Sequence, residues 1–226
     1  TGAAQPVITT GFPTDGPTLA QVGERAVIAA IRAAAPSALN GDDAAVLTPS
    51  VPNSRVVAGT DMLVEGHHFT RATTTPYLLG RKATVQNFAD IEAMGARPIA
   101  ALMGVSVSRD APAAWVEEIA RGIGDMAGEY GCELVGGDLT DGQELVVSVT
   151  AIGSLGGNRP PLTLDAARPG QRVVAHGNIG YSAAGFALLQ SGIDVPEELE
   201  VLVKAHQAPV LTPGRGVVAR AAGATA

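Results

Sequence analysis

The feature that most restricts the fold of this chain is a nearly continuous apolar run at residues 99–107. Such a run is typical of a buried central strand. Helical patterns flank it at 76–94, where Pro76 suits the first position of a helix, and at 111–130. Shorter strands are predicted at 44–47, 55–60, 132–135 and 144–153. Alternation of strands and helices, with at least two antiparallel neighbours, predicts a mixed α/β or α+β layer.

The rest of the chain divides at a glycine- and proline-rich stretch, residues 153–171. Before it, residues 1–17 are expected to form a mobile tail and 19–34 an amphipathic helix, and the strands at 44–47 and 55–60 are expected to form a hairpin. After it, a strand at 172–175 and helices are expected, the latter at 180–189, 197–205 and 215–222. The predicted domains are 17–155, a mixed sheet flanked by helices, and 160–226, the start of an incomplete second α/β domain.

Composition narrows the functional class. Hydrophobic residues make up 46% and charged residues 16% of the 226, enough for a packed core. The net charge of −7, without a block of basic residues, argues against a nucleic-acid partner. No apolar run reaches the ~18 residues of a membrane span, no signal peptide is visible, and the single Cys132 fits a reducing compartment. A cytoplasmic protein without membrane contact is therefore predicted, and its start at Thr1 and open end at Ala226 both look cut.

Short acidic segments recur at four places, each beside glycine or at the end of an apolar element. They occupy residues 40–43, 59–69, 87–90 and 136–138. Asp61 is expected where the strand at 55–60 gives way to a loop. Such carboxylates suit Mg²⁺, which takes oxygen ligands and commonly lies between one or two carboxylates and substrate phosphates. Because aspartate is also common in turns for its hydrogen bonds alone, each segment taken singly has a structural explanation.

Asp90 is expected inside a helix among alanine and phenylalanine, which costs free energy unless its carboxylate has a partner. A salt bridge to Arg81 or Lys82, or a cap, is one explanation, and a metal ion is the other.

Other candidate chemistry is weaker. No Cys or His completes a zinc site around residues 67–68, and the chain has neither a Walker-type loop nor a protein-kinase signature.

Read together, the acidic segments resemble the thiamine-monophosphate kinase family. The resemblance extends from about residue 19 to the end of the chain, including 206–209. Its motifs occur in the family's order at residues 41–45, 60–69, 87–96 and 136–138. The wider superfamily, which includes aminoimidazole ribonucleotide synthetase, shares the Asp-rich ATP site but typically not the sequence motif of residues 64–69.

The resemblance implies direct, in-line transfer of the γ-phosphoryl group of ATP to thiamine monophosphate, giving thiamine diphosphate. Several Mg²⁺ ions would assist, and no covalent or general-base catalytic residue is expected. His68 would face thiamine monophosphate, while Gly137, Asp138 and, on a looser match, Arg159 would contact ATP. The implied metal ligands are Asp42, Thr60, Asp61, Asp90 and Asp138. A homodimer is also implied, with the N-terminal sheets of two subunits joined into a barrel.

The chain departs from the family pattern at its end, because it stops at Ala226, just before an expected Asp-x-Ser-Asp-Gly motif with further magnesium ligands. Little or no kinase activity is therefore expected of these residues alone. Two alternatives stay open: another ATP-dependent enzyme of the superfamily, resembling aminoimidazole ribonucleotide synthetase, or an inactive fragment that binds nucleotide or metal and dimerises.

Overall fold

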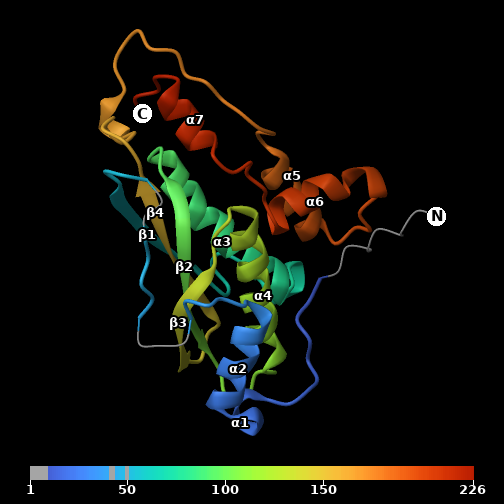
Figure 1. The fold of residues 1–226 in the computed structure, drawn as a ribbon. Helices are drawn as coiled ribbons and strands as arrows, with labels where there is room; N and C mark the ends of the chain where they lie inside the picture. Colours follow the sequence, from blue (N-terminus) through green and yellow to red (C-terminus); the bar gives the residue numbers. More distant parts are fainter. Residues whose placement is uncertain (1–9, 41–43, 49–50) are drawn as a thin grey trace, which may run out of the picture.

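The computed structural model describes residues 10–40, 44–48 and 51–226, and its centre is a four-stranded mixed sheet (Figure 1). The strands lie in the order β1-β4-β2-β3. Their bounds are β1 Arg55–Val64, β2 Arg97–Val107, β3 Leu134–Asp141 and β4 Val146–Leu155. β4 pairs antiparallel with β1 and β2, whereas β2 and β3 are parallel. The predicted mixed sheet and its buried central strand at 99–107 are confirmed.

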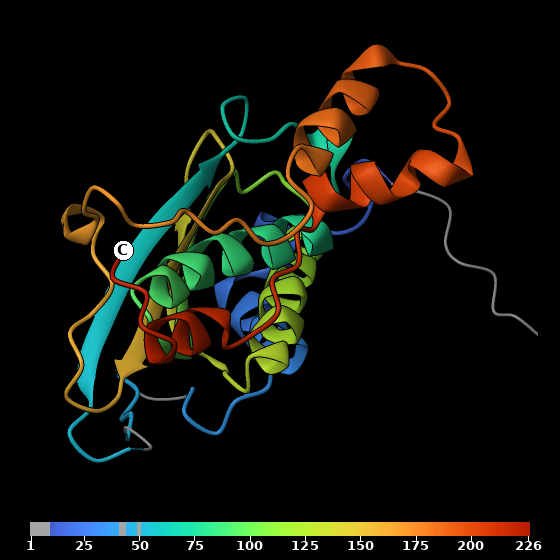
Figure 2. The ribbon, with the colours of Figure 1, turned by 90° about the horizontal axis from the view of Figure 1, so that it is seen from above.

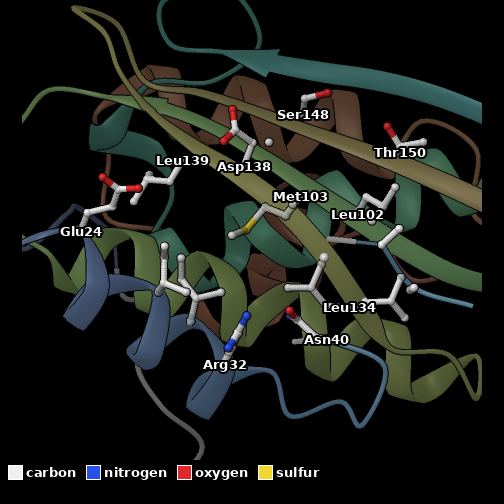
Figure 3. Close-up of a pocket in the computed structure, with 18 residues that line it drawn as sticks. Glu24, Arg32, Asn40, Leu102, Met103, Leu134, Asp138, Leu139, Ser148 and Thr150 are labelled. Carbon is white, nitrogen blue, oxygen red and sulfur yellow. The ribbon is translucent and has the colours of Figure 1, made fainter. Parts of the chain in front are cut away.

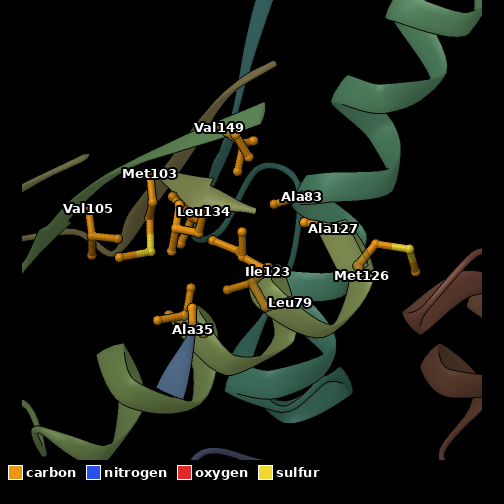
Figure 4. Close-up of a cluster of buried hydrophobic side chains, with 14 of the residues drawn as sticks. Ala35, Leu79, Ala83, Met103, Val105, Ile123, Met126, Ala127, Leu134 and Val149 are labelled. Atoms are coloured by element: carbon orange, nitrogen blue, oxygen red, sulfur yellow. The ribbon is translucent and has the colours of Figure 1, made fainter. Parts of the chain in front are cut away.

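Helices cover one face of this sheet, as Figure 2 shows from above. The covering helices are α2 Glu24–Ala34, α3 Pro76–Ala93 and α4 Ala114–Glu129. Along β4, Val147, Val149 and Ala151 are fully buried, while the residues between them are partly exposed. Figure 4 shows the core below the sheet, where Val149 lies above Ile123. The sheet therefore has one covered face and one open face.

One predicted strand is absent, and β1 and β3 run well past their predicted ends at residues 60 and 135. Residues 44–48 form no strand, so the hairpin predicted between 44–47 and 55–60 is wrong. β1 pairs instead along its whole length with β4, from Arg55 opposite Leu155 to Val64 opposite Val146. A ten-residue register with a distant strand outweighs a short hairpin across a polar turn.

As a consequence, the acidic residues predicted at strand ends lie inside strands. β1 continues past Thr60 to Val64, so Asp61 is a strand residue and not the start of a loop. β3 runs to Asp141, so Asp138 also lies within a strand. Both are edge strands, where polar side chains can reach water without leaving the sheet.

The N-terminal segment differs from the mobile tail predicted for residues 1–17. Of these, 1–9 lie outside the described residues, but Phe12 is buried and packs edge-to-face on Trp115, with ring centroids 4.9 Å apart. The predicted helix at 19–34 is two helices, α1 Leu19–Val22 and α2, because Gly23 between them has φ 82°.

Beyond residue 155 the described chain has helices joined by irregular segments, and the strand predicted at 172–175 is absent, since those residues are solvent-exposed and pair with no other strand. The helices are α5 Tyr181–Ser191, α6 Glu200–Gln207 and α7 Arg215–Ala221. α7 returns to the N-terminal layer, where the Glu92 carboxylate accepts hydrogen bonds from the Gly214 N–H (2.6 Å) and the Gly216 N–H (2.8 Å). The division at 17–155 and 160–226 stays a prediction. None of the described helices is both long and apolar enough for a membrane span.

Cys132 should be chemically silent in the native protein. Burial raises the pKa of its thiol to about 12, against the opposing effect of the Arg97 charge. We expect no reaction with a thiol reagent at pH 8 until the protein is unfolded. In the unfolded chain the thiol has a pKa of about 8.5, so above that pH the unfolded state loses a proton that the folded state keeps. The stability that the protonated thiol contributes is therefore full below pH ~8.5 and is lost between about pH 8.5 and 12. The thermal midpoint of wild type should therefore fall more steeply over this range than that of Cys132→Ala; fast native labelling would contradict the burial.

Candidate active site

The carboxylate of Asp61 lies where β1 crosses α3. Its backbone N–H donates to Oδ1 of Asn87 at 2.7 Å, and its carboxylate accepts from Nε2 of Gln86 at 3.2 Å. Asn87 is only 2% exposed and also donates from Nδ2 to the Ala83 carbonyl at 2.9 Å. A buried amide with both ends satisfied is a rigid link, so α3 fixes the position of this part of β1.

Asp90 lies one helical turn beyond Gln86 on α3 and is solvent-exposed. Partial burial raises the pKa of its carboxyl group, and the negative charge of Asp61 raises it further. The predicted alternative of a salt bridge to Arg81 or Lys82 is wrong, because Arg81 pairs with Glu129 at 2.6 Å and Lys82 forms no ion pair among the described residues. Asp61 and Asp90 are thus two neighbouring carboxylates without a cation from the described chain.

His68 follows β1 in a tight loop and is exposed. The Val64 N–H donates to its Nδ1 at 3.1 Å, so a neutral ring carries its proton on Nε2 and presents it outward. Gly66, at φ 81°, makes the turn, and an ion pair of 2.6 Å between Arg71 and Glu65 braces it. Phe69 is buried and stacks on Phe12, which anchors the loop. These contacts therefore hold His68 in the loop that directly follows the strand of Asp61.

Thr60 and Asp138 lie on the opposite, open face of the sheet. Asp61 shares a row with Val149, which faces the helices, so Thr60 one residue earlier faces away from them. Its hydroxyl donates to the Val149 carbonyl at 3.1 Å and accepts from Thr150 at 3.0 Å. Asp138 pairs with Gly104 of β2 on that same open side.

The predicted metal ligands therefore do not form one cluster within a single chain. β1 and β3 are the two edges of the sheet, and three strand spacings place Asp61 and Asp138 roughly 14 Å apart. In the part of the chain that the structure describes, no three acidic, histidine or cysteine side chains come together as a metal site. Asp42 lies outside the described residues.

A cavity of about 530 Å³ opens beside β3 and under α2, and the sequence did not predict it. Gly137 lines it, together with Asp138, Arg32 and Asn40, and the last three are labelled in Figure 3. Position 137 must be glycine, because a Cβ there would lie 1.9 Å from the Met103 carbonyl oxygen. Arg32 is the only basic residue in the lining, and it forms no ion pair among the described residues. A charged residue on a surface helix gives no sequence signal for such a position.

Arg159 lies elsewhere. Its Nη1 donates to the carbonyls of Arg220 (3.1 Å) and Ala221 (2.8 Å) at the end of α7, and its own carbonyl accepts from Arg55 at 2.5 Å. It lines a second cavity, of about 330 Å³, that contains neither Gly137 nor Asp138. Its predicted contact with ATP stays a prediction.

Comparison with known proteins places this geometry in a family. The model of the AIR synthase related protein N-terminal domain matches residues 41–155. The chain is 62% identical to the thiamine-monophosphate kinase of Corynebacterium glutamicum, over 94% of this chain and 65% of that protein. It is 43% identical to the enzyme of Mycobacterium tuberculosis, over 94% of this chain and 64% of that protein. The chain thus spans a little under two thirds of the length of these relatives.

Solved structures agree. The thiamine-monophosphate kinase of Stenotrophomonas maltophilia superposes with a TM-score of 0.73 at 31% identity, covering 86% of this chain and 64% of that one. AaThiL complexed with AMPPCP and TMP gives a TM-score of 0.64 at 29% identity, covering 84% and 60%. The chain belongs to the AIR synthase related protein family and resembles its thiamine-monophosphate kinase members.

Proposed function

We propose that these residues form the N-terminal part of a thiamine-monophosphate kinase, which transfers the γ-phosphoryl group of ATP to thiamine monophosphate. The observation that carries this proposal is a pair of neighbouring carboxylates, Asp61 on β1 and Asp90 on α3, which no basic side chain among the described residues pairs with, beside the loop after β1 that holds His68. The 62% identity to a protein of that name, and a relative that is complexed with AMPPCP and TMP, support this choice of reaction.

The donor set fits magnesium. Asp61 and Asp90 offer carboxylate oxygens from two different elements, and their mutual repulsion is what a divalent cation relieves. Thr60 and Asp138 offer oxygens on the other face of the sheet, and Asp42 would add another. Bound Mg²⁺ would neutralise the donor and acceptor phosphates and align them.

The phosphoryl transfer itself needs few catalytic groups from the protein. The acceptor oxygen belongs to a phosphate that is already ionised at neutral pH, so we propose direct in-line transfer without a general base or a covalent intermediate. His68 would donate from Nε2 to the thiamine phosphate, since Nδ1 is occupied by the Val64 N–H. The link from Asn87 to β1 would hold the Asp61 carboxylate fixed as charge moves.

We place the nucleotide in the cavity beside β3. Its volume of about 530 Å³ suits a ligand of that size, and Gly137 and Asp138 of β3 line it. Arg32 supplies a positive charge for the polyphosphate in a chain of net charge −7. Arg159 remains the alternative that the family resemblance suggests.

A homodimer would bring the two edges of the sheet together, one from each copy. Within the described residues, β1 and β3 each have a strand partner on one side only, and the open face exposes apolar side chains, with Val56 at 70% and Met62 at 55%. Two sheets that close into a barrel pair β1 of one copy with β3 of the other. That arrangement covers the apolar face and brings the edge with Asp61 beside the edge of the second copy that carries Asp138.

Formation of thiamine diphosphate from ATP and thiamine monophosphate by the full-length protein tests the proposal, and we expect the reaction to require Mg²⁺. Turnover of aminoimidazole precursors instead would favour the other superfamily reaction. Binding of AMPPCP without any turnover would favour a nucleotide-binding module. The single Cys132 fits a cytoplasmic enzyme.

The two arginines give a sharper test of the nucleotide position. We expect Arg32→Ala to weaken AMPPCP binding about tenfold, as loss of one charge-assisted contact does, whereas Arg159→Ala should change it less than about twofold. Calorimetry with Mg²⁺ present measures both, and thermal midpoints control for folding. The opposite ranking would place the polyphosphate at Arg159 and leave the cavity beside β3 without this role.

A further inference from the structure

Lys82 is a half-buried cation that has no partner in the part of the chain that the structure describes. It lies on α3 one turn before Gln86 and two before Asp90, so the three share one side of the helix. It forms no hydrogen bond or ion pair among the described residues, and burial lowers its pKa. The chain's other lysine, Lys204, pairs with Glu200 at 3.1 Å. Burying an ammonium group without a counter-charge costs free energy, so the position calls for an explanation.

A second nitrogen base, His206, lies on α6, which packs against α3 (Figure 2). His206 stacks on Phe186, with ring centroids 4.8 Å apart, and its Nδ1 lies 3.1 Å from Oγ of Ser182. Burial lowers the pKa of His206, and the positive charge of Lys82 on the neighbouring helix α3 lowers it further.

No described carboxylate neutralises this group. α5 has no acidic residue, and on α6 Glu200 is paired with Lys204. On α3, Glu92 is bound by the N–H groups at the start of α7, and Asp90 lies about 12 Å further along the helix. Lys82, the His206 ring and the Ser182 hydroxyl thus lie on helices that pack together, and no carboxylate among the described residues of these helices pairs with Lys82.

We propose that Lys82, His206 and Ser182 form an oxyanion site that binds the phosphate group of the acceptor substrate. The inference rests on the proposed function for the identity of that acceptor. Lys82 lies about 6 Å along α3 from Gln86, which contacts Asp61, so a phosphate held there reaches the acidic pair. The site joins α5 and α6 to the N-terminal layer, and the acceptor would strengthen that contact.

Lys82→Met tests the site, with Lys204→Met as the matched control. We expect Lys82→Met to weaken thiamine monophosphate binding by the full-length protein about ten- to hundredfold, the loss expected for a hydrogen-bonded charge. Lys82→Arg should recover part of the affinity, and Lys204→Met should change it less than about twofold. The thermal midpoint of Lys82→Met should equal or exceed that of wild type, because an unpaired buried charge has been removed.

Two further titrations identify the ligand. AMPPCP affinity should be unchanged in Lys82→Met; a loss confined to AMPPCP would assign the phosphate to the nucleotide and overturn the acceptor site. Equal thiamine monophosphate affinity in wild type and Lys82→Met would overturn it as well. If wild type binds inorganic phosphate through Lys82 but no thiamine monophosphate, the anion site stands and the proposed function fails.

Discussion

Replacing Gly122 by alanine is expected to destabilise the native structure by about 3 kcal/mol, the upper end for an overpacked core. A Cβ at Gly122 would lie 2.0 Å from the Tyr77 carbonyl oxygen, and one at Gly80 would lie 2.1 Å from the Ile119 carbonyl oxygen. α3 and α4 therefore meet backbone to backbone, and neither can move without disturbing the sheet it covers. Urea unfolding followed by circular dichroism measures the change in the free energy of unfolding.

Gly128→Ala is the matched control on the same helix. A Cβ at Gly128 meets nothing within 4 Å, so only the helix propensity changes, and a gain of about 0.5–1 kcal/mol is expected. Two glycine-to-alanine changes six residues apart should thus have opposite signs. A Gly122→Ala variant as stable as Gly128→Ala would show that the helices are not in backbone contact.

The helices and central strands could be predicted because their signals are local. The helix predicted at 76–94 is Pro76–Ala93, since Pro76 begins it and Gly95, at φ 73°, follows its end. The apolar run at 99–107 lies within β2, Arg97–Val107. These signals act over one or two turns of chain, and tertiary packing did not override them.

Strand pairing could not be predicted, because it depends on contacts between distant segments. Closeness in sequence favours a hairpin between 44–47 and 55–60, whereas β1 pairs with β4, which lies some 90 residues later in the chain. The same limit applies to the site. The sequence pattern puts Asp61, Asp90 and Asp138 in one predicted metal site. The strand order and the alternation of faces along the paired strands separate Asp138 from the other two.

Residues whose role depends on their neighbours in the folded chain could not be identified from the sequence. Arg32 and Lys82 are single basic residues on amphipathic helices, where a solvated charge is the ordinary explanation. The proposed role of Arg32 depends on the cavity that it lines, and that of Lys82 depends on His206 of the neighbouring helix α6. Phe12, in a segment predicted to be mobile, was missed for the same reason, because its partners Phe69 and Trp115 are distant in sequence.

Asp61→Asn in the full-length protein is expected to lower turnover of thiamine monophosphate about a thousandfold, the scale on which single electrostatic groups at a reacting centre act. Folding should be nearly unaffected, because the bond from the Asp61 N–H to Asn87 is a backbone contact. The variant also removes the charge that raises the pKa of Asp90. A carboxyl group with a raised pKa destabilises the fold above that pKa, so the thermal midpoint at pH 7 should be equal or slightly higher.

The control is Asp110→Asn, which should retain wild-type turnover. Asp110 is exposed and forms no ion pair among the described residues. The assay follows thiamine diphosphate at rising Mg²⁺. If high Mg²⁺ restored the Asp61→Asn rate fully, the loss would be one of metal affinity alone. The stronger claim, that Asp61 must be charged and fixed for transfer itself, would then be wrong. A rate that stays low at saturating Mg²⁺, with an unchanged midpoint, would assign the loss to the transfer step, because neither folding nor metal occupancy would be limiting.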